Sequence, residues 1–315
     1  MSTIQTPAPL AKGSAHGAQH AWPGLARMRA LIALSRPRQW IKNPAVILLA
    51  LVSLQHWTLR AATGLAWATA LFILASVAAY TVNDIRDRER DRLHPDKRRR
   101  PIASGDLGLS AAWVFLVAVT AALVACVSVV QFGRAWPVCA YLAVTLAYSF
   151  RLKHIPLVDV FAVAAGFVLR AEQGYLALGL RSSSWLLLGV FTTCLVFVLG
   201  KRQRELTQGA HAHRPALGGY SAELLGYLIV ISATLSIVAY IFFVRAGSVQ
   251  NAAALAVTAV LCALFVLFRY LQLITVGHGG ADPVRTLLGD RQLIIVVIIW
   301  LAVTISMHAL HLTTD

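Results

Sequence analysis

Charged residues are scarce in this sequence. Asp, Glu, Lys and Arg make up only 13% of its 315 residues, whereas hydrophobic residues make up 58%. The mean hydropathy of +0.69 is far above that of a soluble globular domain. The composition therefore excludes that class and indicates a protein that is surrounded by lipid.

Cysteine is also scarce, and no secretory signal is evident. The four cysteines lie singly in apolar segments without the paired spacing of a disulfide framework or a zinc site, so we interpret them as small core residues. Residues 1–30 contain no continuous apolar stretch, which argues against a signal peptide. We expect residues 1–30 to form a disordered cytosolic tail that leads into an amphipathic segment near Met28 to Leu34. Residues 31–315 should form a single domain.

Long apolar segments dominate the rest of the chain. A membrane-spanning helix needs about 20 mostly apolar residues, because the hydrocarbon layer is about 30 Å thick and offers backbone groups no water. By this criterion we predict an all-α integral membrane fold with nine transmembrane helices. The segments are 44–60, 62–82, 109–132, 136–150, 157–180, 184–200, 223–245, 251–271 and 292–312.

The positive charge has a topological explanation. A formal net charge of +15 could suggest nucleic acid as a partner, but the positive-inside rule accounts for most of it. With a cytosolic N-terminus, nine spans place most Lys and Arg in cytosolic loops and put the C-terminus outside. We therefore expect a multi-pass protein of the cell (inner) membrane and no nucleic-acid partner. Only Arg60, Arg134, Arg181 and Arg245 then lie outside, with Arg170 inside a span.

The loop between the second and third segments carries more charge than topology requires. It reads NDIRDRERDRLHPDKRRRPIASG from Asn83 to Gly105, and Asp84, Asp87 and Asp91 would share one face of a helix that continues out of the second span. Clustered carboxylates without His or Cys suit Mg²⁺, which takes one or two carboxylates and completes its shell with water and phosphate. The bases that follow would hold phosphate oxygens. A magnesium-diphosphate site and a solvated loop of local ion pairs are the two interpretations of this pattern.

The order of residue types in this loop favours the first interpretation. The string fits NDxxDxxxDxxHPxKxxRPIASG at each fixed position and resembles the first Asp-rich motif of the UbiA superfamily of intramembrane prenyltransferases. The resemblance implies a bundle of nine helices around a lateral cavity open to lipid, with Asp-rich loops and the active site on the cytosolic side. It also implies that Asp84, Asp87 and Asp91 act catalytically and, together with Asn83, bind Mg²⁺.

Five further stretches resemble one branch of that superfamily, the decaprenyl-phosphate phosphoribosyltransferases. This resemblance implies transfer of 5-phosphoribose from phosphoribosyl diphosphate to a polyprenyl phosphate, with release of diphosphate. The reaction starts polyprenyl-phosphate arabinose synthesis for cell-envelope polysaccharides. Membrane lipids would surround the bundle, and a homo-oligomer is left open. The stretches are RPRQWIKN (36–43), AYSFRLKHIPLVD (147–159), GFVLRA (166–171), GKRQREL (200–206) and DPVRTLLGDRQL (282–293).

One segment departs from the wider superfamily. Prenyl-diphosphate users typically carry a second DxxxD motif after the sixth span, where this chain reads KRQRE from Lys201 to Glu205. Exchanging carboxylates for bases removes metal ligands and adds hydrogen-bond donors for phosphate oxygens. This change suits a substrate pair that carries more phosphate groups than a prenyl diphosphate and an aromatic ring. A positive-inside anchor is the alternative. The predicted substrate-binding residues are Lys42, Asn83, Lys97, Arg100, Lys153, Arg170, Lys201, Arg202 and Glu205.

Arg170 and Glu172 lie inside the fifth segment, where ionisable side chains are costly and usually face a polar cavity. We expect Arg170 to point into the active cavity and Glu172 to be either its partner or a separate polar contact. A misplaced span boundary would instead leave both near the outer interface. His94 with Pro95 should end the motif helix, since a lone His is a poor magnesium ligand.

Other functions remain open at the level of sequence. The same fold could transfer an isoprenyl group from its diphosphate to an aromatic acceptor. The absence of the second DxxxD motif argues against this reaction. A transporter could use Arg170 and Glu172 on an ion path, but the sequence shows no convincing internal repeat. A lipid-binding scaffold would explain the basic loop and leave the three aspartates without a purpose.

Overall fold

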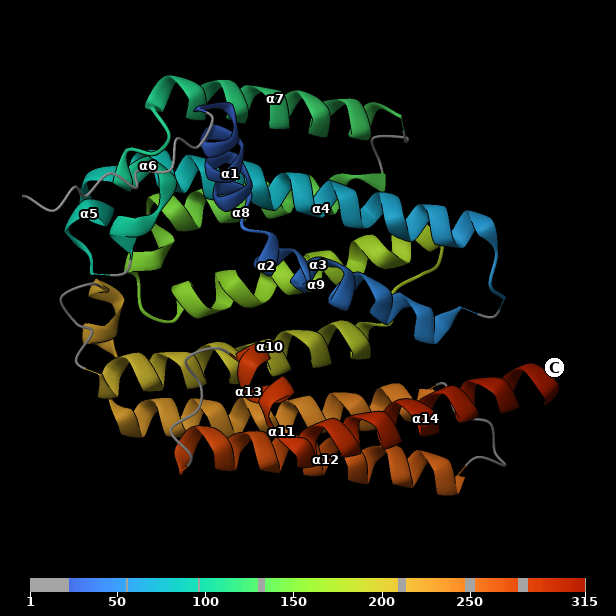
Figure 1. Cartoon of the computed structure of the whole chain (residues 1–315). Coiled ribbons are helices and arrows are strands. Elements are labelled where there is room, and N and C mark those ends of the chain that lie inside the picture. The colour runs from blue at the N-terminus through green and yellow to red at the C-terminus, as the bar shows by residue number, and fades with distance from the viewer. Residues whose placement is uncertain are drawn as a thin grey trace, which may run out of the picture.

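The structure, a computed structural model, describes residues 23–314 apart from residues 55 and 96 and the segments 130–133, 209–213, 247–252 and 277–282. Within these ranges every regular element is a helix, which confirms the all-α prediction. The long helices lie alongside one another in a bundle (Figure 1). They are α4 (Leu59–Arg86), α7 (Leu109–Ser128), α8 (Trp136–Phe150), α9 (Val158–Leu178), α10 (Ser184–Thr207), α11 (Ala222–Ala246), α12 (Ala253–Thr275) and α14 (Arg291–Thr314).

Short helices connect the long ones. The Asp-rich loop contains three of them, α5, η2 and α6, at one end of the bundle, and the C-terminal end of α14 lies at the other (Figure 1). This arrangement agrees with a loop and a C-terminus on opposite sides of a membrane, while the side that faces the cytosol stays a prediction. The short helices are α1 (Pro23–Ser35), α2 (Pro37–Trp40), α3 (Lys42–Ile47), α5 (Arg88–Leu93), α6 (Pro101–Ser104) and α13 (Pro283–Gly289), with 3₁₀ helices η1 (Leu48–Ser53), η2 (Lys97–Arg99), η4 (Leu152–His154) and η6 (Pro215–Gly219).

The outer faces of the bundle suit a lipid environment. By length and composition, five of the described helices could each cross a membrane: α4, α7, α10, α11 and α12. Large apolar side chains such as Val114, Val230 and Phe268 are exposed on these helices, and lipid would cover them. The chain is therefore a multi-pass membrane protein. The count of nine crossings stays a prediction, because α8 and α14 carry shorter apolar stretches and α9 contains charged residues.

The first predicted span, 44–60, is wrong as a single helix. It consists of most of α3 followed by the 3₁₀ helix η1, and α4 then begins at Leu59. The chain here lies directly on α9, in contact through both α3 and η1. A Cβ atom at position 174 would stand 2.3 Å from the carbonyl oxygen of Ile47, so only glycine permits this approach at Gly174. Packing on α9 thus decides the shape of this segment.

α9 is the central helix of the bundle, in contact with α3, α4, α8 and α10. One cluster of buried apolar residues joins α9 to α10, α11 and α12. A second cluster joins α3, α4, α7 and α8 on its other side, and Leu169 of α9 packs against it. Apolar packing on both sides fixes the ends of α4, α8, α9 and α10, from which the candidate site is built.

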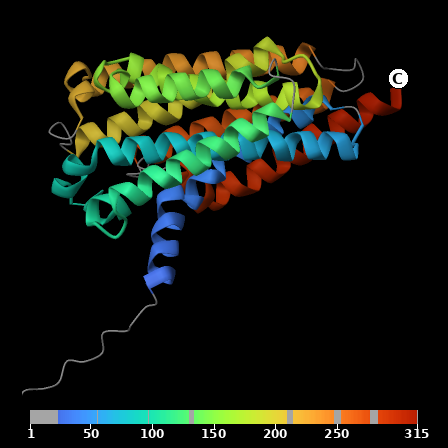
Figure 2. The same ribbon diagram turned by 90° about the horizontal axis from the view of Figure 1, so that it is seen from above.

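The chain enters the bundle through α1, which begins at Pro23. Residues 23–30, which we assigned to a disordered tail, are therefore helical, and residues 1–22 lie outside the described part. Ala30 and Leu34 on one face of α1 are buried against Ile102 and Leu107, and this packing stabilises the helix. Figure 2 shows α1 projecting across the direction of the long helices, as expected for a helix that lies in the plane of a membrane surface.

Candidate active site

The acidic motif begins on the last turn of α4. Asn83 and Asp84 belong to this helix, which confirms that the second span continues into the motif, but the helix ends at Asp87 with φ −85° and ψ 7°. α5 then starts again at Arg88 and carries Asp91. The expectation of one continuous helix is therefore wrong, because Asp87 separates α4 from α5. The helical hydrogen bonds from Asp87 N–H to Asn83 and from Asp91 N–H to Asp87 are kept across this break, and the shared face of the three aspartates stays a prediction.

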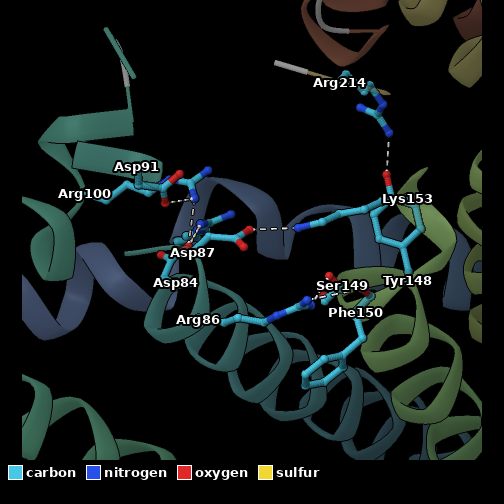
Figure 3. Close-up of polar contacts among 11 residues, drawn as sticks. Asp84, Arg86, Asp87, Asp91, Arg100, Tyr148, Ser149, Phe150, Lys153 and Arg214 are labelled. Carbon is cyan, nitrogen blue, oxygen red and sulfur yellow. Dashed lines mark hydrogen bonds and ion pairs between the residues drawn. The ribbon is translucent and has the colours of Figure 1, made fainter. Parts of the chain in front are cut away.

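Asp84 and Asp91 are joined by one guanidinium group. Arg100 Nη1 donates to Asp84 Oδ1 at 2.9 Å and to Asp91 Oδ2 at 2.6 Å, and Arg36 Nη2 donates to the same Asp84 oxygen at 2.5 Å. The two carboxylates are almost completely buried, with side chains 2% and 5% exposed. Figure 3 shows Arg100 reaching toward both aspartates. Burial raises the pKa of Asp91, and the charge of Arg100 partly offsets this effect.

Asp87 has a different partner. Lys153 Nζ lies 2.9 Å from Asp87 Oδ2, and its side chain extends from η4, just after α8, toward the motif (Figure 3). Arg86, on α4, donates to the carbonyl oxygens of Ser149 and Phe150 and thereby ties the end of α4 to the end of α8. These contacts bring the Asp-rich loop together with the stretch AYSFRLKHIPLVD, although more than 60 residues separate Asp87 from Lys153.

The turn after α5 positions Arg100. His94 ends α5, as predicted, and accepts a hydrogen bond from the backbone N–H of Lys97 through Nδ1. Arg100 directly precedes α6, which begins at Pro101, and its side chain makes no capping hydrogen bond. Gly105 ends α6 with φ 91°, a conformation that glycine adopts without strain. Burial lowers the pKa of Lys97, and the neighbouring charge of Arg100 adds to that effect. The turn from His94 to Arg100, with backbone hydrogen bonds from Arg98 to His94 and from Arg100 to Lys97, thus brings Arg100 back to the aspartates.

This donor set fits a magnesium ion held by two carboxylates. No group of three His, Cys, Asp or Glu side chains in the described part of the chain is placed to hold a metal ion. Asp84 and Asp91, however, both contact a single cationic nitrogen, so the two carboxylates face one position that a cation occupies. Mg²⁺ often takes only one or two protein carboxylates. The predicted roles of Asn83 and Asp87 as further ligands stay predictions.

A second charged cluster lies at the same end of the bundle. Lys201 to Glu205 form the last turns of α10, so the helix of the predicted span 184–200 continues for about two more turns through these good helix formers. Arg202 is buried with Nε 2.9 Å from Asp159 Oδ2, and it also pairs with Glu205. Arg214 lies 3.3 Å from the same Asp159 oxygen. The acidic partners of these bases include Asp159 on α9, which the sequence reasoning missed.

Tyr220 completes this cluster. Its hydroxyl donates to Asp159 Oδ1 at 2.6 Å and accepts from the backbone N–H of Leu157 at 2.7 Å. Burial and the hydrogen bond to Asp159 raise the pKa of Tyr220. Leu157 has φ 65°, and its hydrogen bond to Tyr220 holds this strained backbone at the start of α9. Asp159 ends the stretch AYSFRLKHIPLVD, and this position was the only sequence signal for it.

Arg170 lies deep in the bundle rather than at the outer interface. It is buried on α9 and donates to Asn43, to the carbonyl oxygen of Gly166 and to the hydroxyl of Tyr141. Among the described residues it has no carboxylate partner, and Glu172 leaves Oε2 buried without one. The structure therefore does not pair Arg170 with Glu172 and gives it no contact with the Asp84 cluster.

Two further predicted substrate-binding residues are more exposed to solvent than Arg170. Lys201 is exposed on α10, and Lys42 is half-buried at the start of α3. The predicted lateral cavity stays a prediction. A groove of about 230 Å³ between α7 and α8 is lined by apolar residues with Ser128 and Cys139, and none of the predicted site residues lines it.

Known proteins resemble this chain in sequence and in fold. A model of the UbiA prenyltransferase family matches residues 43–288. The decaprenyl-phosphate phosphoribosyltransferase of Corynebacterium glutamicum is 32% identical over 281 residues, covering 86% of this chain and 84% of that protein. The enzyme of that name from Mycolicibacterium smegmatis is 34% identical over 292 residues, covering 86% and 90%.

A solved structure gives the same picture of the fold. A UbiA homolog from Archaeoglobus fulgidus, bound to GPP and Mg²⁺, matches with a TM-score of 0.68 at 16% identity, over 89% of this chain and 99% of that one. A likeness at this identity shows a shared helical bundle.

Proposed function

The chain belongs to the UbiA prenyltransferase family, and on this basis we propose that it transfers 5-phosphoribose from phosphoribosyl diphosphate to a polyprenyl phosphate. Diphosphate is released, and the product would serve polyprenyl-phosphate arabinose synthesis. The choice of donor rests on relatives that are named decaprenyl-phosphate phosphoribosyltransferase and match over 84% and 90% of their length.

One structural observation carries the proposal: the buried carboxylates Asp84 and Asp91 share the guanidinium group of Arg100. Carboxylates that can hold a metal ion, next to bases that can hold phosphate oxygens, are what a metal-bound diphosphate requires. In the bound state Asp84 and Asp91 would hold Mg²⁺, with Asn83 and Asp87 as further ligands. The ion would neutralise negative charge on the leaving diphosphate.

The basic side chains have a separate task. Arg100, Lys97 and Lys153 surround the aspartates and would donate to phosphate oxygens of the donor substrate. Arg202 is paired with Glu205 and Asp159 and has only 4% of its side chain exposed, so we assign Arg202 and Glu205 to the shape of the site. Lys201 and Lys42 are the more accessible candidates for the phosphate of the lipid acceptor or of the ribose.

The reaction needs no general base from the chain. The bond between ribose C1 and the diphosphate oxygen breaks, and a phosphate oxygen of the lipid forms the new bond to C1. This oxygen is already anionic at neutral pH, so the protein must chiefly position the two substrates and stabilise charge. Because the exposed faces of the helices are apolar, the isoprenoid chain of the acceptor would remain in the bilayer beside them.

A transfer assay tests the proposal. The purified protein in detergent is given ribose-labelled phosphoribosyl diphosphate, Mg²⁺ and a panel of polyprenyl phosphates, and label in the organic phase is counted. We expect label to appear in lipid only when both a polyprenyl phosphate and Mg²⁺ are present. No labelled lipid with any acceptor, together with transfer from an isoprenyl diphosphate to an aromatic acceptor, would replace the proposal with prenyl transfer.

A further inference from the structure

Arg36 connects the start of the chain to the candidate active site. It lies between α1 and α2, and its side chain reaches across 48 residues of sequence to Asp84. Its guanidinium group also lies 4.8 Å from the centre of the Tyr80 ring. The site prediction did not include this residue, because a basic residue before the first span reads as a positive-inside charge.

We propose that Arg36 is a diphosphate-binding residue that exchanges its partner Asp84 for a phosphate oxygen when the donor substrate binds. The inference rests on the proposed function only in so far as the site receives a metal-bound diphosphate. It does not depend on which group that diphosphate carries.

Two guanidinium groups compete for Asp84. Arg36 and Arg100 both donate to one oxygen, Asp84 Oδ1, so two guanidinium groups converge on a single acceptor and repel each other. Their side chains are about a quarter exposed, whereas Asp84 is buried. An anion with several oxygens would give each guanidinium group its own acceptors, and guanidinium groups bind phosphate oxygens especially well.

The charges around the aspartates are unequal. Among the described residues of this cluster, three carboxylates face four cationic side chains, so the cations outnumber the acids by one. The surplus increases further once the carboxylates bind a metal ion. A diphosphate supplies the missing negative charge. The carboxylates are Asp84, Asp87 and Asp91, and the cations are Arg36, Lys97, Arg100 and Lys153.

The backbone of Arg36 is strained. Arg36 has φ 53° and ψ 61°, a left-handed conformation that costs free energy in any residue with a side chain. Pro37 disfavours a helical backbone at the preceding residue and adds to that cost. The indole N–H of Trp40 donates to the carbonyl oxygen of Ser35 and fixes this turn. Strained residues of this kind occur often at functional sites, where the surrounding structure holds them in place.

A structural ion pair between the start of the chain and α4 is the competing explanation. The two differ in what happens when Asp84 is removed. If Asp84 competes with diphosphate for Arg36, Asp84→Asn should strengthen the binding of metal-free diphosphate, and this gain should need Arg36. A purely structural pair predicts no such gain.

The test uses the full chain in detergent, inorganic diphosphate as the probe, and calorimetry as the readout. With Mg²⁺, Arg36→Gln should weaken diphosphate binding at least about tenfold, and Arg36→Lys should weaken it less. Arg38→Gln is the matched control, because Arg38 is exposed two residues away; its affinity should stay within about twofold. In EDTA, Asp84→Asn should bind diphosphate more tightly than the wild type, and adding Arg36→Gln should abolish the gain.

The outcomes separate this inference from the proposed function. Wild-type affinity in Arg36→Gln, or a gain in Asp84→Asn that persists without Arg36, overturns the role of Arg36 and leaves phosphoribosyl transfer untouched. Transfer of an isoprenyl group by the wild type overturns the proposed function while the Arg36 result stands. A wild type that binds no diphosphate with Mg²⁺ overturns both.

Discussion

Arg170 Nε donates a 2.7 Å hydrogen bond to Asn43 Oδ1, although 127 residues separate them in the sequence. The bond joins α3 to α9 and connects two of the stretches used for the family resemblance, RPRQWIKN and GFVLRA. The guanidinium group also lies over the rings of Tyr141, Phe72 and Phe167. Aromatic faces and neutral oxygens thus solvate this buried cation. The contacts assign Arg170 a structural task, and its predicted contact with phosphate stays untested.

Replacing Arg170 should therefore destabilise the bundle. We expect Arg170→Ala to reduce the free energy of unfolding by about 2–4 kcal/mol, because a cavity opens and buried acceptors lose their donor. Thermal unfolding in detergent measures the effect. Arg181→Ala, at an exposed position, is the control and should change little. If Asn43 and Arg170 act as a pair, the double variant Asn43→Ala/Arg170→Ala should lose less than the sum of the single variants; simple additivity would contradict the pairing.

Asp84 is the carboxylate on which the catalytic assignment depends most. Asp84→Asn removes a charge that two guanidinium groups contact and a predicted metal ligand. We expect transfer to fall by about 100-fold or more while the protein still inserts and folds. Asp106→Asn is the matched control in the same loop, where Asp106 is exposed. Equal activity in the two variants at saturating Mg²⁺ would remove Asp84 from the active site.

The second cluster should contribute to stability through Tyr220. Tyr220→Phe deprives the buried Asp159 of a donor and the backbone N–H of Leu157 of its acceptor. Leaving such groups unpaired costs about 1–3 kcal/mol. The control is Tyr227→Phe, which removes an exposed hydroxyl bound to Glu223 and should cost less than about 0.5 kcal/mol. Equal losses of unfolding free energy in the two variants would mean that Asp159 does not need this hydroxyl.

The stability of the fold should depend on pH through Asp290, which lies away from the candidate active site. Hydrogen bonds from Arg269 and from the backbone N–H of Leu293 lower the pKa of Asp290. Because the folded pKa lies below the unfolded value of about 3.9, the stabilisation is present above that pH and is lost as the pH falls through the folded pKa. Asp290→Asn keeps an acceptor at the start of α14 and removes the charge. Its melting temperature should lie below that of the wild type at pH 6, and the difference should shrink toward pH 3. A difference that does not depend on pH would contradict the ion pair with Arg269.

The sequence predicted what depends on local pattern. Apolar length located the helices α4 and α7 to α12, and the motif identified Asp84, Asp91 and Arg100, which the structure brings together. The predictions from sequence were wrong where packing against residues far away in the sequence decides the local structure. The approach of Ile47 to Gly174 on α9 breaks the first span.

Contacts across the chain account for the residues that were missed. Arg36 and Asp159 have partners far away in sequence, so periodicity could not detect them. Both lie in stretches that resemble the family, but the resemblance alone assigned them no role. Asp87 likewise pairs with Lys153, which comes from another helix end.

The most direct test offers the wild-type protein both donor types at once. Phosphoribosyl diphosphate and an isoprenyl diphosphate are supplied together with Mg²⁺, a polyprenyl phosphate and an aromatic acceptor, and the lipid products are identified by mass spectrometry. The account predicts a polyprenyl phosphate enlarged by one phosphoribosyl group, absent when EDTA is added or when Asp84→Asn replaces the wild type. A prenylated aromatic product, with the polyprenyl phosphate unchanged, would contradict it.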